Sequence, residues 1–107
     1  MIDRELIEQA ALAAGITGEW GHEGYIERNE GFIPQGWRRA WNPLRIDGDA
    51  FQLSVKLALT IYHWPHEICV CNENNTVNVS VPRVGDTNAA TRRAIALAAA
   101  EIGRNIP

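Results

Sequence analysis

The fold is decided by residues 41–59, which read WNPLRIDGDAFQLSVKLAL. Pro43 disfavours helical backbone at the residue before it, so the first part of this stretch should be an ordered approach segment. Residues 50–59 then predict a helix of which three residues are polar: Gln52, Ser54 and Lys56. A helix that is apolar nearly all round is normally covered on more than one side. We therefore expect this helix to be the central element of the fold.

Two aspartates stand at the start of this helix. Asp47 or Asp49 could cap it, because a carboxylate can accept a hydrogen bond from an unpaired first-turn amide. Gly48 permits the turn between them. A carboxylate pair could also hold Mg²⁺ through phosphate oxygens, but the sequence does not indicate further ligands. We interpret both aspartates as structural caps.

The N-terminal segment predicts a helix over residues 3–14. Apolar side chains recur along one side of it, whereas its charged side chains lie mostly on the other. Asp3 is the expected N-cap. Gly15 followed by Ile16 is typical of a helix end in which a left-handed glycine precedes an apolar residue that folds back on the last turn.

The C-terminal segment predicts a second long helix. Asp86 or Thr87 should cap it, and Gly103 should end it after about Ile102. Its expected inner stripe comprises Ala94, Ile95, Ala98 and Ile102. We expect Arg92 and Arg93 to point outward into solvent.

Residues 17–40 are rich in glycine, so any strand there should be short. Residues 19–20 and 25–27 could pair as a small ribbon around residues 21–24, and residues 29–36 should form a loop. The spacing of Trp37 and Trp41 fits either a short helical turn or an irregular wall of the core.

Residues 60–64 predict a strand that ends at Pro65, and a hairpin follows over about residues 67–82. Pairing about Asn74-Asn75 sets Val70 opposite Val79 and Ile68 opposite Val81 on one face, with the cysteines on the other. Asparagine tolerates the positive φ that a tight primed turn needs. A one-residue slip would move every valine into water, so this register is well specified.

With 107 residues the chain should be one domain, residues 1–107. The order of elements predicts an α+β fold, a small layered domain with three helices packed on a short antiparallel or mixed sheet. The formal net charge of −3 counts against nucleic acid as the main partner. The charged N-terminus is unlike a signal peptide, and no window is apolar enough to span a membrane. We expect a cytoplasmic protein without a cofactor or a membrane partner.

The densest group of metal-ligand types is His63, His66, Cys69 and Cys71. Two imidazoles and two thiols could bind zinc if they converge tetrahedrally, although this spacing is not a standard structural-zinc pattern. The alternative is a strand end with surface histidines, in which the cysteines act as small apolar side chains. Two cysteines one residue apart on a strand have poor disulfide geometry, so no disulfide is expected.

A second group combines cations with indoles: Arg28, Trp37, Arg38, Arg39, Trp41 and Arg45. Arginine beside tryptophan could stack bases or hold a phosphate, which would make a nucleotide or nucleic-acid site. The arginine stems could equally pack on the indoles beside neighbouring acids.

Three segments carry a resemblance to a known family. They are WNPL at residues 41–44 with DGDA at 47–50 and VKL at 55–57; ELIE at 5–8 with AAGI at 13–16; and AATRRAI at 89–95 with AAEIGR at 99–104. In these segments the chain resembles a family of phage and prophage proteins of unassigned function. Residues 17–36 and 60–85 are not matched. Ala58 departs from the family pattern, which leads us to expect glycine there.

The resemblance implies a phage accessory protein that works in the cytoplasm of a bacterial host, with a possible relation to the small phage α-β-α sandwich domains. It implies no activity, cofactor or catalytic residue. The residues themselves contain no glycine-rich phosphate loop and no nucleophile or metalloprotease motif. We therefore expect a non-enzymatic interaction module that binds a host or phage protein, either as a monomer or as a homodimer. Nucleotide binding and metal binding are the alternatives.

Overall fold

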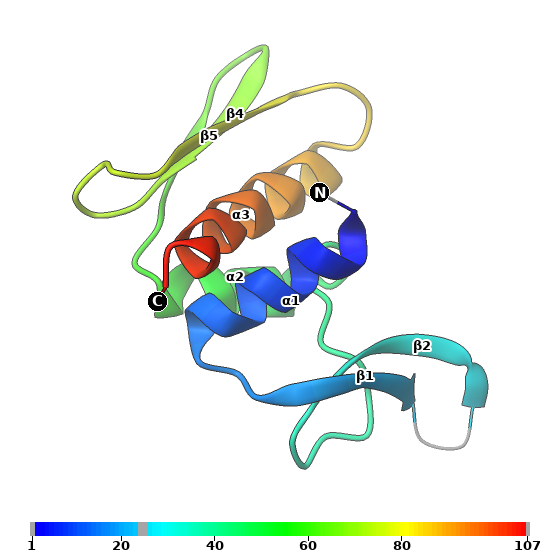
Figure 1. Ribbon diagram of the computed structural model, residues 1–107. Helices are drawn as coiled ribbons and strands as arrows, with labels where there is room; N and C mark the ends of the chain where they lie inside the picture. Colours follow the sequence, from blue (N-terminus) through cyan, green and yellow to red (C-terminus); the bar gives the residue numbers. More distant parts are fainter. Residues whose placement is uncertain (1, 24–25, 107) are drawn as a thin grey trace.

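The computed structural model describes residues 2–23 and 26–106, and the side chains of residues 26–29 lie outside this description. It shows an α+β fold with three helices and two antiparallel sheets. The elements in chain order are α1 (Asp3–Ala14), β1 (Gly18–Glu23), β2 (Ile26–Pro34), α2 (Asp47–Lys56), β3 (Thr60–His63), β4 (Glu67–Cys71), β5 (Asn78–Pro82) and α3 (Thr87–Arg104). The helices lie between a three-stranded sheet and a two-stranded ribbon (Figure 1).

The central helix is α3, not α2. Three residues of its expected inner stripe, Ala94, Ile95 and Ala98, are buried, and Ile102 is half-buried against the core. Further alanines along the helix are also buried: Ala90, Ala96, Ala99 and Ala100. These small side chains let α1 and α3 approach closely. Gly103 is buried inside α3, where an added Cβ would overlap the carbonyl of Gln9 in α1. The prediction that Gly103 ends the helix is therefore wrong, because this glycine serves helix packing.

The three-stranded sheet has the order β3-β4-β5. The predicted hairpin register is confirmed, with Val70 opposite Val79 and Ile68 opposite Val81. Ile68, Val70 and Val81 are buried against α3.

The hairpin turn differs from the prediction. Backbone bonds from Asn75 N to Asn72 O and from Asn72 N to Val77 O close a four-residue loop. Asn75 takes a positive φ of 58°. A tight type I′ turn would need a positive φ at both Asn74 and Asn75. Asn75 alone has one, and the chain forms the longer loop instead.

The ribbon of β1 and β2 is longer than predicted. Glu19 pairs with Ile33 and Trp20 with Phe32, so the expectation of a loop at residues 29–36 is wrong. The glycines do not shorten the strands, because Gly21 pairs with Gly31 inside them. A side chain at residue 31 would collide with Ala40. This glycine therefore lets the segment after β2 pack onto the ribbon.

The helix α2 begins at Asp47 as predicted but ends at Lys56, earlier than expected. Directly after it, Leu59 N donates to Ser54 O and Ala58 N donates to Val55 O. These two bonds are those of a Schellman end, with Ala58 at the left-handed position and a φ of 52°.

One predicted cap is confirmed and three are wrong. Asp86 caps α3, since its carboxylate accepts from the backbone amides of Asn88 and Ala89. The residue preceding α1 is Ile2, so Asp3 lies inside the first turn, and it pairs there with Arg93. No side chain caps α2, and both Asp47 and Asp49 lie inside its first turn.

Candidate functional site

Asp49 is the most strongly engaged carboxylate of the predicted sites. Its two oxygens each accept from Arg39, at 3.0 Å from Nη2 to Oδ1 and 3.0 Å from Nη1 to Oδ2. Oδ2 also accepts from the backbone amide of Asn42 at 2.9 Å. Asp49 is only 5% exposed, so these bonds replace the water that burial removes. Asp49 thus fastens the approach segment to α2.

Arg39 makes further contacts besides those to Asp49. Its Nη1 also donates to the carbonyl of Ala40 at 2.9 Å, and its guanidinium lies 4.7 Å from the ring centre of Trp37. The hydrogen bonds to Asp49 raise the pKa of the Arg39 guanidinium above its ordinary value, and desolvation partly opposes this effect. A cation with a bidentate carboxylate partner has little left to offer a phosphate.

The predicted tryptophans do not form an open stacking platform. Trp41 is 3% exposed and packs edge-on against Phe32, with ring centres 6.3 Å apart. Trp37 is 42% exposed, and Arg39 lies over one face of its ring.

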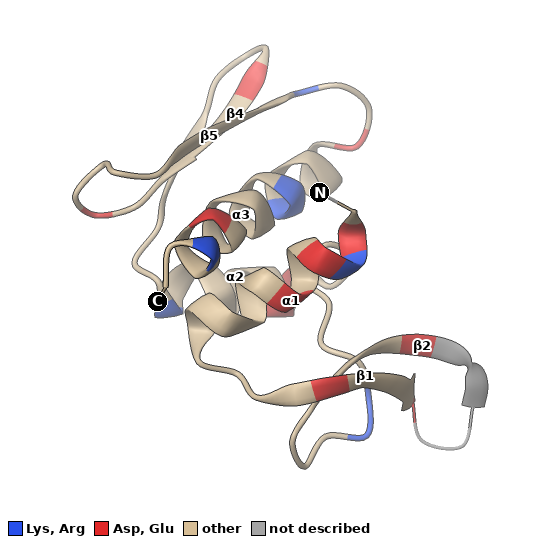
Figure 2. Ribbon diagram, in the orientation of Figure 1, with Lys and Arg blue, Asp and Glu red and all other residues tan. Residues whose placement is uncertain are grey.

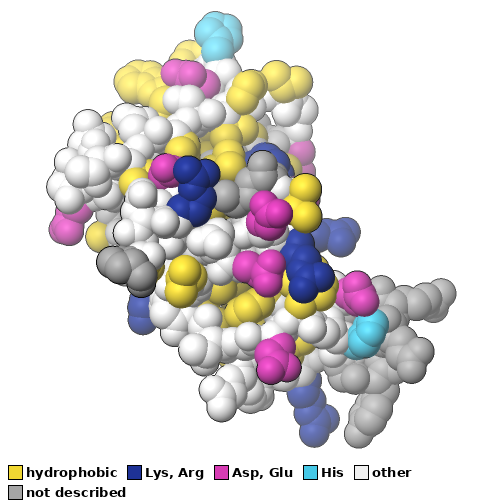
Figure 3. Space-filling view, viewed as in Figure 1, with side chains coloured by type: hydrophobic (Ala, Val, Ile, Leu, Met, Phe, Trp, Pro, Cys, Tyr) yellow, Lys and Arg dark blue, Asp and Glu magenta, His cyan; other side chains and the backbone are white. Residues whose placement is uncertain are grey.

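The remaining arginines of this group do not complete a phosphate site. Arg38 and Arg45 are exposed, and the side chain of Arg28 lies outside the described residues. Acidic and basic side chains are interspersed over the helices (Figure 2), and the face seen in Figure 3 has no continuous field of either sign. The geometry therefore favours the alternative in which the arginine stems pack on indoles.

The predicted metal residues do not come together. In the antiparallel pairing His63 is opposite Ile68, whereas Cys69 is opposite Tyr62, so His63 and the cysteines lie on different faces of the sheet. Cys69 Sγ instead lies 3.2 Å from Ser80 Oγ. His66 is exposed in the turn between β3 and β4, and both thiols are free. Within the part of the chain that is described, no three His, Cys, Asp or Glu side chains could hold a metal ion.

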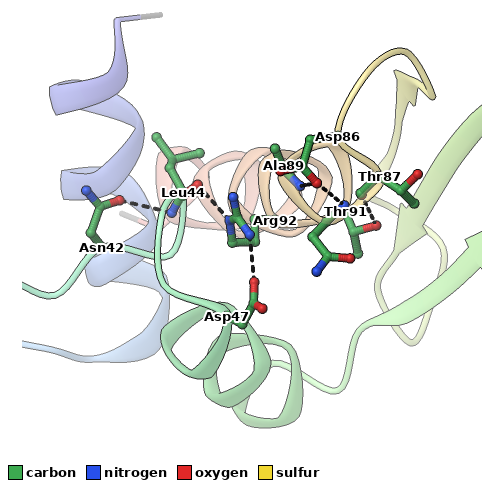
Figure 4. A network of polar contacts seen from close by, with 9 residues as sticks. Asn42, Leu44, Asp47, Asp86, Thr87, Ala89, Thr91 and Arg92 are labelled. Atoms are coloured by element: carbon green, nitrogen blue, oxygen red, sulfur yellow. Dashed lines mark hydrogen bonds and ion pairs between the residues drawn. The ribbon is translucent and has the colours of Figure 1, made fainter.

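A polar network joins α3 to the start of α2 (Figure 4). Arg92 Nη1 binds Asp47 Oδ1 at 2.6 Å, and Arg92 Nε donates to the carbonyl of Leu44 at 2.9 Å. The side chain of Arg92 is 17% exposed. The expectation that Arg92 points into solvent is wrong, because its guanidinium binds Leu44, which precedes α2, and Asp47, the first residue of α2.

The helix α2 has an open apolar surface. Ala50 and Leu53 are buried, but Phe51 is 63% exposed and Val55 is 60% exposed. Residues four apart share one face of a helix, so these two side chains form an outward apolar face. The expectation that α2 is covered on more than one side is wrong.

Beside this face lies a crevice of about 290 Å³ between α2, β3 and α3. Phe51, Ile61 and Ile95 supply its apolar walls, and His63 and Arg92 lie among its polar lining. On the outer face of the same sheet, the rings of Tyr62 and Trp64 stack, with centres 6.1 Å apart and planes at 11°. Tyr62 is 47% exposed and Trp64 is 51% exposed.

Other depressions lie around the segment between β2 and α2. One of about 600 Å³ is lined by Ile16, Trp37, Trp41 and Gln52 among others, and one of about 620 Å³ runs along the ribbon. Asp49 borders the first of these depressions, and its carboxylate is already bound to Arg39.

Comparison of the chain with protein-family models, with curated proteins and with solved structures finds no match. Among the described residues, no helix has the length and apolar character needed to cross a membrane.

The apolar surface at Phe51 and β3 was not predicted as a site. The sequence does indicate this surface, because it predicts a helix with apolar side chains nearly all round. That pattern has two explanations. Such a helix is either enclosed or left open for a partner. Periodicity does not distinguish them, because the choice depends on which elements the chain brings to each side.

Proposed function

We propose that this protein is a non-enzymatic interaction module that binds another protein through the outward face of α2 and the adjoining edge of the three-stranded sheet. The observation that carries the proposal is the exposure of Phe51 and Val55, 63% and 60%, on one face of a helix. Contiguous apolar surface of this kind is typical of protein-binding sites.

The residues around this face support the same hypothesis. Tyr62 and Trp64 present two exposed rings, and aromatic side chains are enriched in protein interfaces. The predicted cation and metal sites offer less, since Arg39 is bound to Asp49 and His63 lies on the face opposite the cysteines. In keeping with the resemblance, we propose that the partner is a protein of the bacterial host or of the phage.

The test is site-specific photo-crosslinking in a bacterial host that carries the phage. A photoreactive phenylalanine analogue replaces Val55, and as a control it replaces Asn74, which is exposed in the hairpin loop. A discrete adduct from position 55 and none from position 74 supports the proposal. An adduct with a second copy of the chain identifies a homo-oligomer, and an equal pattern from both positions refutes the assigned surface.

A further inference from the structure

The strand β3 has an open edge whose backbone direction can be assigned. Trp64 N donates to Glu67 O at 2.9 Å, so this pair is a hydrogen-bonded one. Hydrogen-bonded pairs alternate along an antiparallel ladder. Tyr62 therefore directs its amide and carbonyl toward β4, and Ile61 and His63 direct theirs away from the sheet. No described residue bonds to these outward groups.

The backbone of the opposite edge is open to a similar extent. Arg83 N donates to His66 O and Asn72 N donates to Val77 O, which by the same alternation points the backbone of Asn78, Ser80 and Pro82 outward. Proline has no amide hydrogen, so Pro82 ends the row of outward donors on β5, as Pro65 ends it on β3. What distinguishes the edge of β3 is the crevice beside it, which is lined by Ile61 and His63.

The inner face of β3 is also incomplete. Ile68 and Val70 on β4 are 0% exposed, whereas Ile61 is half-buried and His63 is exposed. The crevice of about 290 Å³ lies directly below Ile61 and His63, with the exposed ring of Phe51 as its far wall. The sheet therefore lacks side chains at the position where a further strand would supply them.

From these features we infer that the edge of β3 binds an extended segment of a partner polypeptide as a fourth strand. The amides and carbonyls of Ile61 and His63 bond to its backbone, and two of its side chains, spaced two residues apart, enter the crevice. The segment carries apolar side chains at these alternate positions, because Phe51, Ile61 and Ile95 line the crevice. This inference rests on the proposed function and names the kind of partner.

An amphipathic helix fits this edge less well than an extended segment, because it would leave the outward backbone groups of Ile61 and His63 unpaired.

A second copy of the chain fits less well than a foreign segment. Twofold pairing of two β3 strands about Tyr62 would set Ile61 of one copy beside His63 of the other. Each crevice would then receive one isoleucine and one imidazole. Burying an imidazole against Phe51 carries a desolvation cost that a segment with two apolar side chains avoids.

The test begins with a displayed library of random twelve-residue peptides selected on the purified full-length protein. We expect the enriched peptides to share apolar residues two positions apart. Amide hydrogen exchange then locates the strand. In the free protein Tyr62 should be protected and His63 should exchange fast, and a bound peptide should slow the exchange of His63 at least about tenfold.

Matched variants separate edge pairing from general apolar contact. His63→Pro removes an outward amide on β3, and its control Asn78→Pro removes an outward amide on β5. Phe51→Lys changes the crevice wall, and its control Leu12→Lys introduces the same charge at an exposed apolar residue of α1 outside the crevice. We expect peptide binding about fivefold to tenfold weaker in the first variant of each pair and less than twofold weaker in its control, since His63→Pro removes one backbone hydrogen bond and Phe51→Lys removes an apolar wall of the crevice. Thermal unfolding of each variant confirms that it is folded.

The inference is overturned if no peptide is enriched, if enriched peptides carry the three-to-four-residue spacing of a helix, or if His63→Pro binds as tightly as Asn78→Pro. Sedimentation as a dimer that His63→Pro dissociates would replace the foreign segment with a second copy. A crosslink from position 55 would survive each of these outcomes, so the proposed function and this inference fail separately.

Discussion

Two helix ends of the same type offer a matched test of backbone strain. After α1, Gly15 N donates to Leu12 O and Ile16 N donates to Ala11 O, and Gly15 takes a φ of 71°. After α2 the equivalent position is Ala58, with a φ of 52°. An L-residue in this left-handed region costs about 1 kcal/mol because its Cβ crowds the following carbonyl. We therefore expect Ala58→Gly to stabilise the protein and Gly15→Ala to destabilise it.

The magnitudes follow from the surroundings. Both residues are exposed, and a Cβ added at Gly15 would meet no atom within 4 Å, so the backbone energy dominates. Glycine also loses more freedom on folding, which offsets about 0.5 kcal/mol of the gain at residue 58. We expect a net gain of about 0.5 kcal/mol for Ala58→Gly and a net loss of about 0.5 kcal/mol for Gly15→Ala, to which the same offset applies with the opposite sign. Ala58→Asn should lie between the parent and Ala58→Gly, since asparagine tolerates this region.

The assay is urea unfolding followed by circular dichroism, with thermal unfolding in parallel. The midpoint should shift without a change in slope, because the surface exposed on unfolding is unchanged. A change of 1 kcal/mol corresponds to roughly 4 °C in a domain of this size. If Ala58→Gly lowers the midpoint, or if both substitutions move it in the same direction, the left-handed strain assigned to Ala58 is refuted.

Two further substitutions test the helix packing and the ion pair between Asp49 and Arg39. Gly103→Ala should cost more than about 3 kcal/mol in urea unfolding, because its Cβ would overlap the backbone of Gln9; Gly48→Ala, with open space around it, should change stability by less than about 1 kcal/mol. Asp49→Ala should cost about 2–3 kcal/mol, since it leaves a backbone amide and Arg39 without their acceptor. Because the pKa of Arg39 is raised above its ordinary value, its contribution is present at neutral pH and is lost only at strongly alkaline pH. Arg39 should therefore give this cost no pH dependence between pH 7 and 10, and a marked change across that interval would contradict the assignment.

The parts of the fold that the sequence predicted are those in which one local pattern has one solution. The hairpin register followed from alternation, because any other pairing would expose Val70 and Ile68. The cap at Asp86 followed from a carboxylate placed just before a long apolar-periodic run. In both cases the residues that decide the structure are neighbours in the chain.

Apart from the hairpin turn and the end of α2, which are local, the failures concern residues whose partners are distant in sequence. Asp47 and Asp49 have the spacing of caps, but arginines at residues 92 and 39 bind them instead. Gly103 has the position of a helix stop, but its role depends on the approach of α1. The strand β2 was missed because a paired strand tolerates Gly31 where another segment packs onto it.

The same long-range bonds bear on how the candidate surface works. Arg92 holds the start of α2 from α3, and the bond from Arg39 to Asp49 holds it from the segment after β2. One turn further along, Phe51 is the exposed residue. A helix fixed at its first turn from two sides presents that ring in a defined position before any partner arrives. Binding then costs less conformational entropy than it would on a loosely held helix, which is why we place the interaction on α2 and β3 and regard the two aspartates as the residues that position it.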